Sequence, residues 1–202
     1  MNDMSSLESK PNDNRNRSVI LLLLGWLCVA IGLAGWFRNA SAPAVAATVW
    51  ILTALVLLAC WQIAFIRTWA LNVDLRWLVL FHLTRLFAGV YFLLLCQEGQ
   101  LPCGFASRAG WGDIIVAVLA LTVVVVMRSQ FGKTLLLIWN ALGLIDIVFV
   151  VFSALRFGLA DWQSMHALRE LPLGLLPTFV VPLIIASHIL IFVRLLRKRS
   201  VA

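Results

Sequence analysis

A permanent positive charge lies inside an otherwise apolar segment of this sequence. Arg85 stands near the middle of the segment 77–96, and His82 precedes it by three residues, which places both side chains on one face of a helix. An unpaired arginine at the centre of a bilayer costs about 2.5–3.5 kcal/mol on insertion scales. Arg85 is therefore expected to be paired inside the protein, and with His82 it is the first candidate for a functional site.

The expected partner of Arg85 is Asp146, in the apolar segment 135–155. If the segments cross the membrane in alternating directions, a rise of 1.5 Å per residue places Arg85 about 12 Å and Asp146 about 16 Å from the same surface. Gly143 lies one turn before Asp146 and allows another helix to approach closely. The two opposite charges are thus predicted to form an ion pair near the middle of the membrane.

A layer of uncharged polar residues is expected next to this pair. His82, Asn140 and His188 each lie about 8 Å from the same surface on this scale, and Gln62 and Thr122 lie near that level. Their side chains are predicted to complete hydrogen bonds around the charges. Such a network either fixes the register of the helices or forms a binding site or pathway, and charges inside membranes are most often functional.

The leading functional hypothesis is a site that binds or transports a small anion, a polar solute or protons. Arg85 would attract an anionic group, while Asp146 and the histidines would exchange protons. Asp113 follows the motif "GWG" and is expected to cap the next helix at the outer entrance of this site.

Three alternatives have a basis in the residues. A haem could be ligated by His82 and His188, which lie at equal depth on different segments. A lipid-modifying enzyme could use a serine, but no G-x-S-x-G motif and no paired catalytic carboxylates occur, so no catalytic residue is predicted. A non-catalytic assembly factor is the third alternative. No metal site is predicted, because the sequence has no zinc-binding spacing of cysteines and histidines.

The elements that position these residues are predicted to be six membrane-spanning helices. The chain has 202 residues, of which 62% are hydrophobic and 12% are charged, a balance that is not typical of soluble domains. An all-α bundle is the expected fold, with the lipid bilayer as its main partner. Six apolar stretches are long enough to cross a bilayer, namely 19–37, 44–66, 77–96, 111–127, 135–155 and 173–193.

Basic residues predict the orientation of this bundle. Arg85 lies inside the membrane, and Arg38, Arg108, Arg156 and Arg169 lie on one side. The other eleven basic residues lie on the side of both termini, which the positive-inside rule assigns to the cytoplasm. Because the net charge of +7 is spread over helix ends, nucleic acid is not an expected partner. A bacterial inner membrane is the predicted location.

The chain is expected to divide into three parts. The polar head, residues 1–18, lacks the apolar residues needed for a core and is predicted to be disordered in the cytoplasm. The transmembrane domain covers residues 19–193, and residues 194–202 form a basic cytoplasmic tail. A cleaved signal peptide is the alternative for the first helix, although its apolar run exceeds the roughly 7–15 residues usual for such peptides.

Three features of the outer side are predicted from local sequence. Cys96 and Cys103 flank the loop "CQEGQLPC" and could form a disulfide in an oxidising periplasm. The fourth helix is expected to be short and discontinuous, beginning below the surface after a loop that dips inward. Pro172, Pro177 and Pro182 are expected to kink the outer half of the sixth helix.

The chain also resembles small bacterial integral membrane proteins of unassigned function. The resemblance covers the third to sixth helices and leaves the first 70 residues unmatched, and no activity is implied by it. It is carried by Arg85, Gly89, "GQLPCGFASRAGWGD" (99–113), "NALGLID" (140–146), Leu171, Pro172, Val181, Pro182 and His188.

Overall fold

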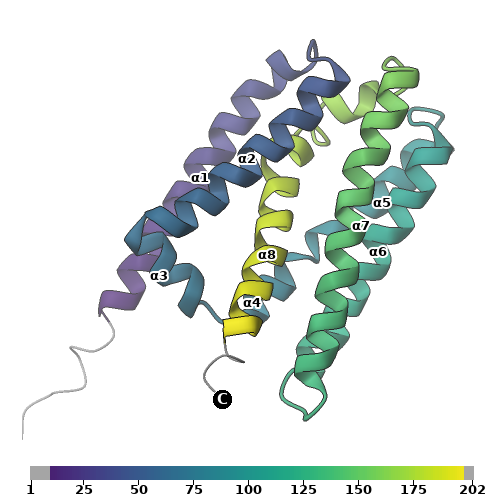
Figure 1. Ribbon diagram of the computed structural model, residues 1–202. Coiled ribbons are helices and arrows are strands. Elements are labelled where there is room, and N and C mark those ends of the chain that lie inside the picture. Colours follow the sequence, from purple (N-terminus) through teal and green to yellow (C-terminus); the bar gives the residue numbers. More distant parts are fainter. Residues whose placement is uncertain (1–9, 198–202) are drawn as a thin grey trace, which may run out of the picture.

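The computed structural model describes residues 10–197, and these residues contain helices and no strands. Six helical spans are long and apolar enough to cross a membrane, as the sequence predicted. Span three consists of two helices, and span six begins with a π-helical turn (Figure 1). The elements are α1 (Lys10–Phe37), α2 (Ala42–Gln62), α3 (Ala64–Asn72), α4 (Leu75–Phe81), α5 (Thr84–Gln97), α6 (Cys103–Val126), α7 (Gly132–Ala160), the 3₁₀-helix η1 (His166–Arg169), the π-helix η2 (Leu176–Val180) and α8 (Val181–Arg197).

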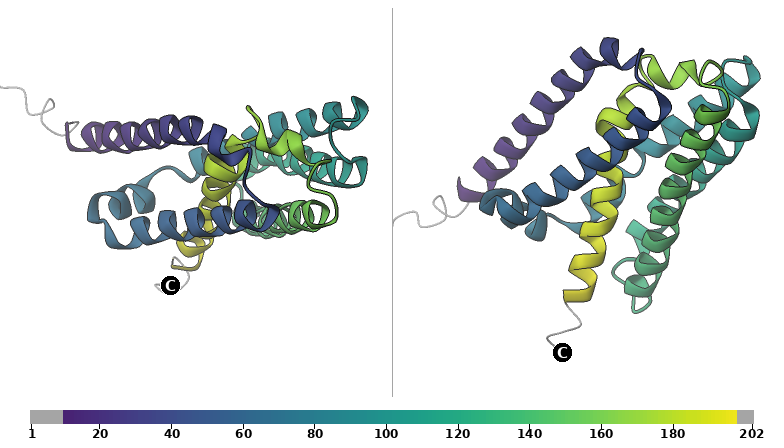
Figure 2. Two further views of the ribbon diagram at one scale, coloured as in Figure 1. Left: turned by 90° about the horizontal axis from the view of Figure 1, so that it is seen from above. Right: turned by 45° about the horizontal axis from the view of Figure 1, so that its top comes forward.

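The spans run up and down, so that α1 begins and α8 ends at the same end of the molecule (Figure 1). We refer to this as the terminal end, and to the other as the opposite end. Helix α8 lies between the α1–α2 pair and the group formed by α5, α6 and α7, as the views from the side and from above both show (Figure 2). A central α8 can therefore contribute side chains to sites on both of its sides.

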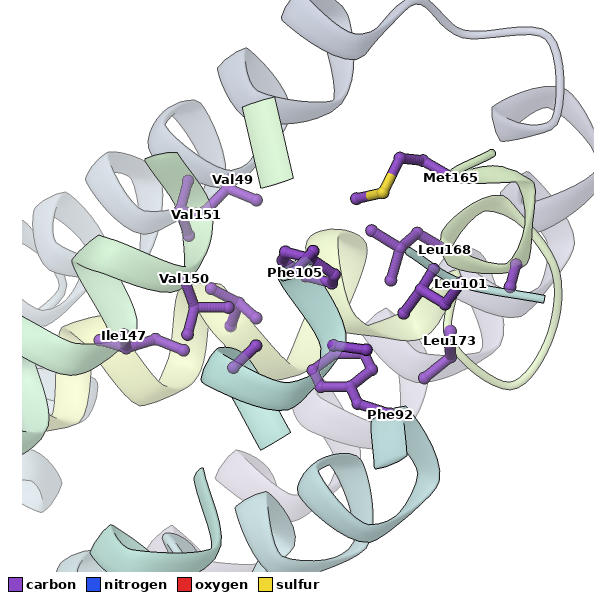
Figure 3. Packing of buried hydrophobic residues seen from close by; sticks show 14 of the residues in the cluster. Val49, Phe92, Leu101, Phe105, Ile147, Val150, Val151, Met165, Leu168 and Leu173 are labelled. Atoms are coloured by element: carbon purple, nitrogen blue, oxygen red, sulfur yellow. The ribbon is translucent and has the colours of Figure 1, made fainter. Parts of the chain in front are cut away.

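The largest apolar core lies towards the opposite end. It joins α5, α6 and α7 to the segment that follows α7, and Phe92 and Phe105 meet edge to face at its centre with ring centroids 5.5 Å apart (Figure 3). Met165, which is fully buried, and Leu168 belong to the segment after α7 and pack against this core. The segment after α7 contains the 3₁₀-helix η1.

Hydrogen bonds to backbone carbonyls hold α1 and the α1–α2 turn to the rest of the bundle. Trp162 Nε1 donates to the carbonyl of Ala40 over 2.8 Å, and Arg169 donates to the carbonyl of Arg38 over 3.0 Å. Trp26 on α1 donates to a carbonyl in η2. These three contacts matter because the side chains of α1 are otherwise mostly exposed.

The turn between α5 and α6 has a regular helix-ending geometry. Gly99 has φ +69°, a conformation in which glycine has no Cβ penalty. The amide of Gly99 donates to the carbonyl of Cys96, and the amide of Gln100 donates to the carbonyl of Leu95, which together form a Schellman motif. The motif directs the chain back on itself, and Cys96 and Cys103 are joined by a disulfide in the structure.

The expected discontinuity occurs in span three and not in the fourth helix. Helix α6 is continuous from Cys103 to Val126, so the predictions of a short fourth helix and of an inward-dipping loop are wrong. The reason is that "CGFASRAG" is helical, and Phe105, Ala106, Ala109 and Gly110 are buried as parts of α6. Span three, by contrast, is interrupted between α4 and α5.

Helix boundaries near the terminal end also differ from the predictions. The second span ends at Gln62 because Ile63 is extended, and the chain continues as the short helix α3. Helix α1 begins at Lys10, so residues 10–18 of the head, expected to be disordered, continue the first helix. Residues 1–9 of the head and residues 198–202 of the tail lie outside the described residues.

Candidate functional site

The guanidinium of Arg85 is shared between two carboxylates from two helices. Its Nε donates to Asp113 Oδ1 on α6 over 2.6 Å, and its Nη2 donates to Asp146 Oδ2 on α7. Its Nη1 donates to the backbone carbonyl of Gly143 over 3.1 Å. Arg85 therefore ties α5, α6 and α7 together through three different acceptors, and it pairs with Asp146 as expected from the sequence.

The charges in this cluster do not balance. One guanidinium faces two carboxylates, which leaves a formal charge of −1 when all three groups are ionised. The side chain of Arg85 is 1% exposed and that of Asp113 is 4% exposed, whereas that of Asp146 is 22% exposed. Asp146 is thus the member of the cluster that the surroundings can reach.

All three charged residues lie near the middle of their spans. Asp146 is fourteen residues from each end of α7. Asp113 is ten residues after the start of α6, and Arg85 is ten residues after the start of span three. The middle of a span lies farthest from the polar regions on either side of a membrane. A charge at this depth therefore costs the most free energy.

Glycines make room for the cluster. A Cβ on Gly89 of α5 would lie 2.6 Å from the carbonyl oxygen of Gly110 on α6, so these two helices are in backbone contact directly beside Arg85. A Cβ on Gly112 would collide with the carboxylate of Asp146. A larger side chain at position 89 would separate α5 from α6, and one at position 112 would displace the Asp146 carboxylate, so both positions require glycine.

The helix break in span three lies next to this cluster. Between α4 and α5 the amides bond to carbonyls three residues earlier: His82 to Val79, Leu83 to Leu80 and Arg85 to His82. A tightened turn within a long helix often marks either a functional hinge or a strained sequence. The break orients the His82 ring towards α8, where the sequence had predicted only a regular helical face.

Two histidines form a second, uncharged cluster with Asn140 and Ser187. The rings of His82 and His188 have centroids 4.2 Å apart. His188 Nδ1 lies 2.8 Å from Asn140 Oδ1, and Asn140 Nδ2 donates to the backbone carbonyl of His188 over 3.0 Å. Ser187 Oγ lies 3.1 Å from His82 Nε2. His82, Asn140 and His188 meet as the sequence predicted.

Each histidine keeps one ring nitrogen without a hydrogen-bond partner among the described residues. These atoms, His82 Nδ1 and His188 Nε2, are both buried. A Cβ on Gly143 would lie 3.0 Å from His188 Nε2, so this nitrogen lies against the residue whose carbonyl accepts from Arg85. The histidine cluster and the charged cluster are therefore in direct contact at Gly143.

The sequence misplaced Asp113, which lies inside α6 and pairs with Arg85. It neither caps a helix nor marks an outer entrance. A pattern of small residues was the signal that could have located it: the buried face of α6 follows spacings of four and three residues, which is typical of helix interfaces. This face consists of Ala106, Gly110, Asp113, Ala117 and Ala120.

Two polar residues that were expected near the site do not join it. Gln62 lies at the exposed end of α2, and Thr122 is exposed on α6, so neither lies in the predicted layer. Ser187, by contrast, belongs to the histidine cluster. It adjoins His188 in sequence, yet the ring that it contacts belongs to His82 from a different span. The sequence held no signal for that contact, because it depends on the packing of α8 against the break in span three.

The histidines do not fit a haem. Two axial imidazoles must lie on opposite faces of the macrocycle, but these two rings touch each other, and Trp139 packs edge-on against His82 with centroids 5.0 Å apart. No group of three histidine, cysteine or acidic side chains among the described residues is placed to hold a metal ion. The arrangement is instead suited to hydrogen bonding and proton exchange.

A family model described as "Domain of unknown function (DUF8737)" matches residues 25–196. The chain belongs to this family. No curated protein and no solved structure matches the chain in the corresponding comparisons.

The extent of the DUF8737 match adds to the sequence comparison above. It begins at residue 25 within α1, so the family domain includes part of the first span and all of the second, both of which the resemblance had left unmatched. It also contains every residue of the charged and histidine clusters. In this DUF8737 domain the polar site is therefore a part of the family's shared region rather than of an added segment.

Proposed function

We propose that this protein is a multi-pass protein of the bacterial inner membrane whose charged cluster binds and transfers protons. The observation that carries this proposal is the sharing of one guanidinium, Arg85, between two carboxylates, Asp113 and Asp146. The cluster lies at the middle of six spans that are long and apolar enough to cross a membrane. A net charge of −1 at this depth is costly and favours uptake of a compensating cation, of which the proton is the smallest.

The charge balance argues against the anion that the sequence suggested. Three nitrogens of Arg85 already donate to two carboxylates and one carbonyl. An incoming anion would meet two acids that are already competing for one cation. Protons and positively charged solutes are favoured by the same electrostatics.

The histidine cluster supports a route for protons away from the acids. Asp146 is partly exposed, and Gly143 connects the charged cluster to His188. His188 contacts His82, and both rings retain a buried nitrogen that can accept or donate a proton. Chains of acids and histidines of this kind are the usual proton relays of membrane pumps and transporters.

The orientation proposed from the basic residues is unchanged. Both termini would lie in the cytoplasm, because the ends of the spans at the terminal end carry the larger number of arginines and lysines. The disulfide between Cys96 and Cys103 is at the opposite end and would then lie in the periplasm, where disulfides persist. The π-helical turn at Pro177 would be the outer bend of span six.

Proton flux in proteoliposomes tests the proposal. The purified protein is reconstituted with a pH-sensitive dye inside the vesicles, and a potassium gradient with valinomycin drives proton entry. We expect internal acidification at least several times faster than in protein-free vesicles, and we expect Asp146→Asn to remove this difference, since the amide cannot take up a proton.

The matched control is Asp161→Asn, the same chemical change in an exposed residue between α7 and η1. It should leave the rate unchanged. Equal rates in wild type and protein-free vesicles, or equal rates in wild type and Asp146→Asn, would rule out proton transfer by this cluster.

One contact favours a second candidate function, a lipid-modifying hydrolase or acyltransferase. Ser187 Oγ lies 3.1 Å from His82 Nε2, and Ser187 also lines an apolar cavity. The hydroxyl donates to the carbonyl of Ile184 over 2.8 Å, so it would have to turn towards His82 before that ring could act as a general base. A fluorophosphonate probe would label Ser187 in wild type and in His188→Ala but not in Ser187→Ala. Absence of labelling in wild type would exclude a nucleophilic serine.

A further inference from the structure

Two apolar cavities lie near the terminal end, one on each side of the short helix α3. The first, of about 380 Å³, is bordered by α1, α2, α3, α4 and α8. The second, of about 310 Å³, is bordered by α2, α3 and α8. Both fall in the range of roughly 300–1,000 Å³ that is typical of ligand sites in proteins. Neither overlaps the charged cluster around Arg85.

The two cavities share one wall. Cys60, Ala186 and Leu190 line both of them, and Trp69 and Ala70 on α3 face the first and the second cavity respectively. Helix α3 thus separates two apolar cavities that both border α8. A ligand with two apolar chains is the occupant whose shape matches such a pair.

Two arginines lie at the mouth of the second cavity. Arg67 on α3 and Arg197 at the end of α8 both contribute to its lining. Arg67 donates to the carbonyl of Trp61 over 3.5 Å, and the Arg197 guanidinium lies 5.9 Å from the centroid of the Trp61 ring. Both positive charges therefore lie beside Trp61, and no acidic side chain among the described residues forms an ion pair with either arginine.

The dimensions agree with one leaflet of a bilayer. The second cavity follows α8 from Arg197 to Ala186, eleven residues or about 16 Å at 1.5 Å per residue. Half of a hydrocarbon core of about 30 Å has the same depth. The arginines would consequently lie at the level of lipid headgroups when the chains fill the cavities.

We propose that these two cavities and the arginine pair form a binding site for one anionic phospholipid, with an acyl chain on each side of α3 and the phosphate between Arg67 and Arg197. The inference rests on the membrane location proposed above but not on proton transfer. Basic groups beside grooves between spans are a recurring mode of anionic lipid recognition. Two of the three tryptophans that line the first cavity are Trp69 and Trp77, near the terminal end, and tryptophan is typical of the headgroup level.

Native mass spectrometry measures this binding directly. The delipidated protein in detergent is incubated with equal amounts of dioleoyl-phosphatidylglycerol and dioleoyl-phosphatidylcholine, which differ only in the headgroup. A basic residue near the membrane surface contributes roughly a fivefold preference for an anionic lipid, and two contribute about thirtyfold. We expect wild type to bind phosphatidylglycerol in preference to phosphatidylcholine by a factor of this order.

The double variant Arg67→Ala/Arg197→Ala should reduce the preference to less than about threefold. Its matched control is Arg128→Ala/Lys133→Ala, which removes two exposed charges from the same end of the molecule but from residues that line neither cavity. The control should behave as wild type. An unchanged preference in the first variant, or an equal loss in the control, would overturn the proposal.

A steric variant tests the acyl-chain part separately. Ala59 lines the first cavity, and Ala47 lies exposed on the same helix and lines neither. We expect Ala59→Trp to lower the fraction of protein that retains any lipid about tenfold, and Ala47→Trp to leave it unchanged. Full lipid retention in a folded Ala59→Trp variant would show that no chain occupies the cavity. Proton flux can fail while this binding is found, so the two proposals are tested independently.

Discussion

Replacing the two acids around Arg85, singly and together, tests the shared ion pair. After Asp113→Asn the guanidinium still faces Asp146, and after Asp146→Asn it still faces Asp113. Each single change also removes the excess negative charge. We therefore expect each single variant to be only mildly destabilised, and the double variant to be destabilised by far more than the two together.

The magnitudes follow from burial and pairing. Loss of one charged hydrogen bond costs roughly 1.5–3 kcal/mol, and removal of the net charge offsets part of this, so each single change should cost about 1 kcal/mol. The double variant leaves a guanidinium that is 1% exposed without a counter-ion, which costs about 3–5 kcal/mol. An additive pair would cost only about 2 kcal/mol.

Thermal unfolding in detergent micelles measures these differences through intrinsic tryptophan fluorescence. For a chain of this size, 1 kcal/mol shifts the midpoint by roughly 2–4 °C. The single variants should melt about 2–4 °C below wild type, and the double variant about 6–20 °C below it. Restoring charge balance in the triple variant with Arg85→Gln should recover part of the loss.

Two outcomes would contradict this reasoning. If the double variant melts at the sum of the single shifts, the acids do not compensate for one another and Arg85 is not shared. If either single variant is as unstable as the double, one acid alone balances the charge. Variant Asp161→Asn should melt as wild type and controls for the amide substitution itself.

Three further predictions concern neighbouring parts of the structure. Gly89→Ala places a methyl group 2.6 Å from the carbonyl oxygen of Gly110 and should destabilise the protein by about 1–3 kcal/mol, measured by thermal unfolding. Cys96→Ser opens a short disulfide loop and should cost about 2 kcal/mol in the same assay under oxidising conditions. Asn140→Ala removes both hydrogen bonds to His188 and should cost about 1–3 kcal/mol, together with slower proton flux.

Each of these has a control or a contrary result. Gly25→Ala has nothing within 4 Å of the new methyl group and should be neutral or stabilising, because alanine favours helices. The midpoint of Cys96→Ser should equal that of wild type once a reductant is present, and a lasting difference would indicate a packing effect. Unaltered flux in a stable Asn140→Ala variant would exclude the histidine cluster from the proton route.

The spans and the main ion pair could be predicted from the sequence because both follow from the cost of polar groups in an apolar medium. Uninterrupted apolar runs locate the six helices. An unpaired charge inside a membrane costs free energy, so Arg85 and Asp146 are expected to pair, and their predicted depths from the same surface are similar. No three-dimensional information is needed for either step.

The local breaks could not be predicted because they depend on packing. The short apolar run of the fourth helix suggested a loop that dips inward before it, yet the preceding residues are helical and Gly110 lets α6 approach α5. The interruption at His82 has no glycine or proline at the break to signal it. Both mistakes concern residues beside the site, where the requirements of packing and of polar contacts outweigh local helix preferences.

The attachment of the first two spans has a consequence for how related sequences can vary. The hydrogen bonds from Trp162 and Arg169 reach the carbonyls of Ala40 and Arg38, and never their side chains. Substitution at positions 38 and 40 therefore leaves both bonds intact as long as the turn keeps its path. Among related sequences, we expect Trp162 and Arg169 to be retained, because their side chains donate these bonds. Positions 38 and 40 should vary, because only their backbone carbonyls take part.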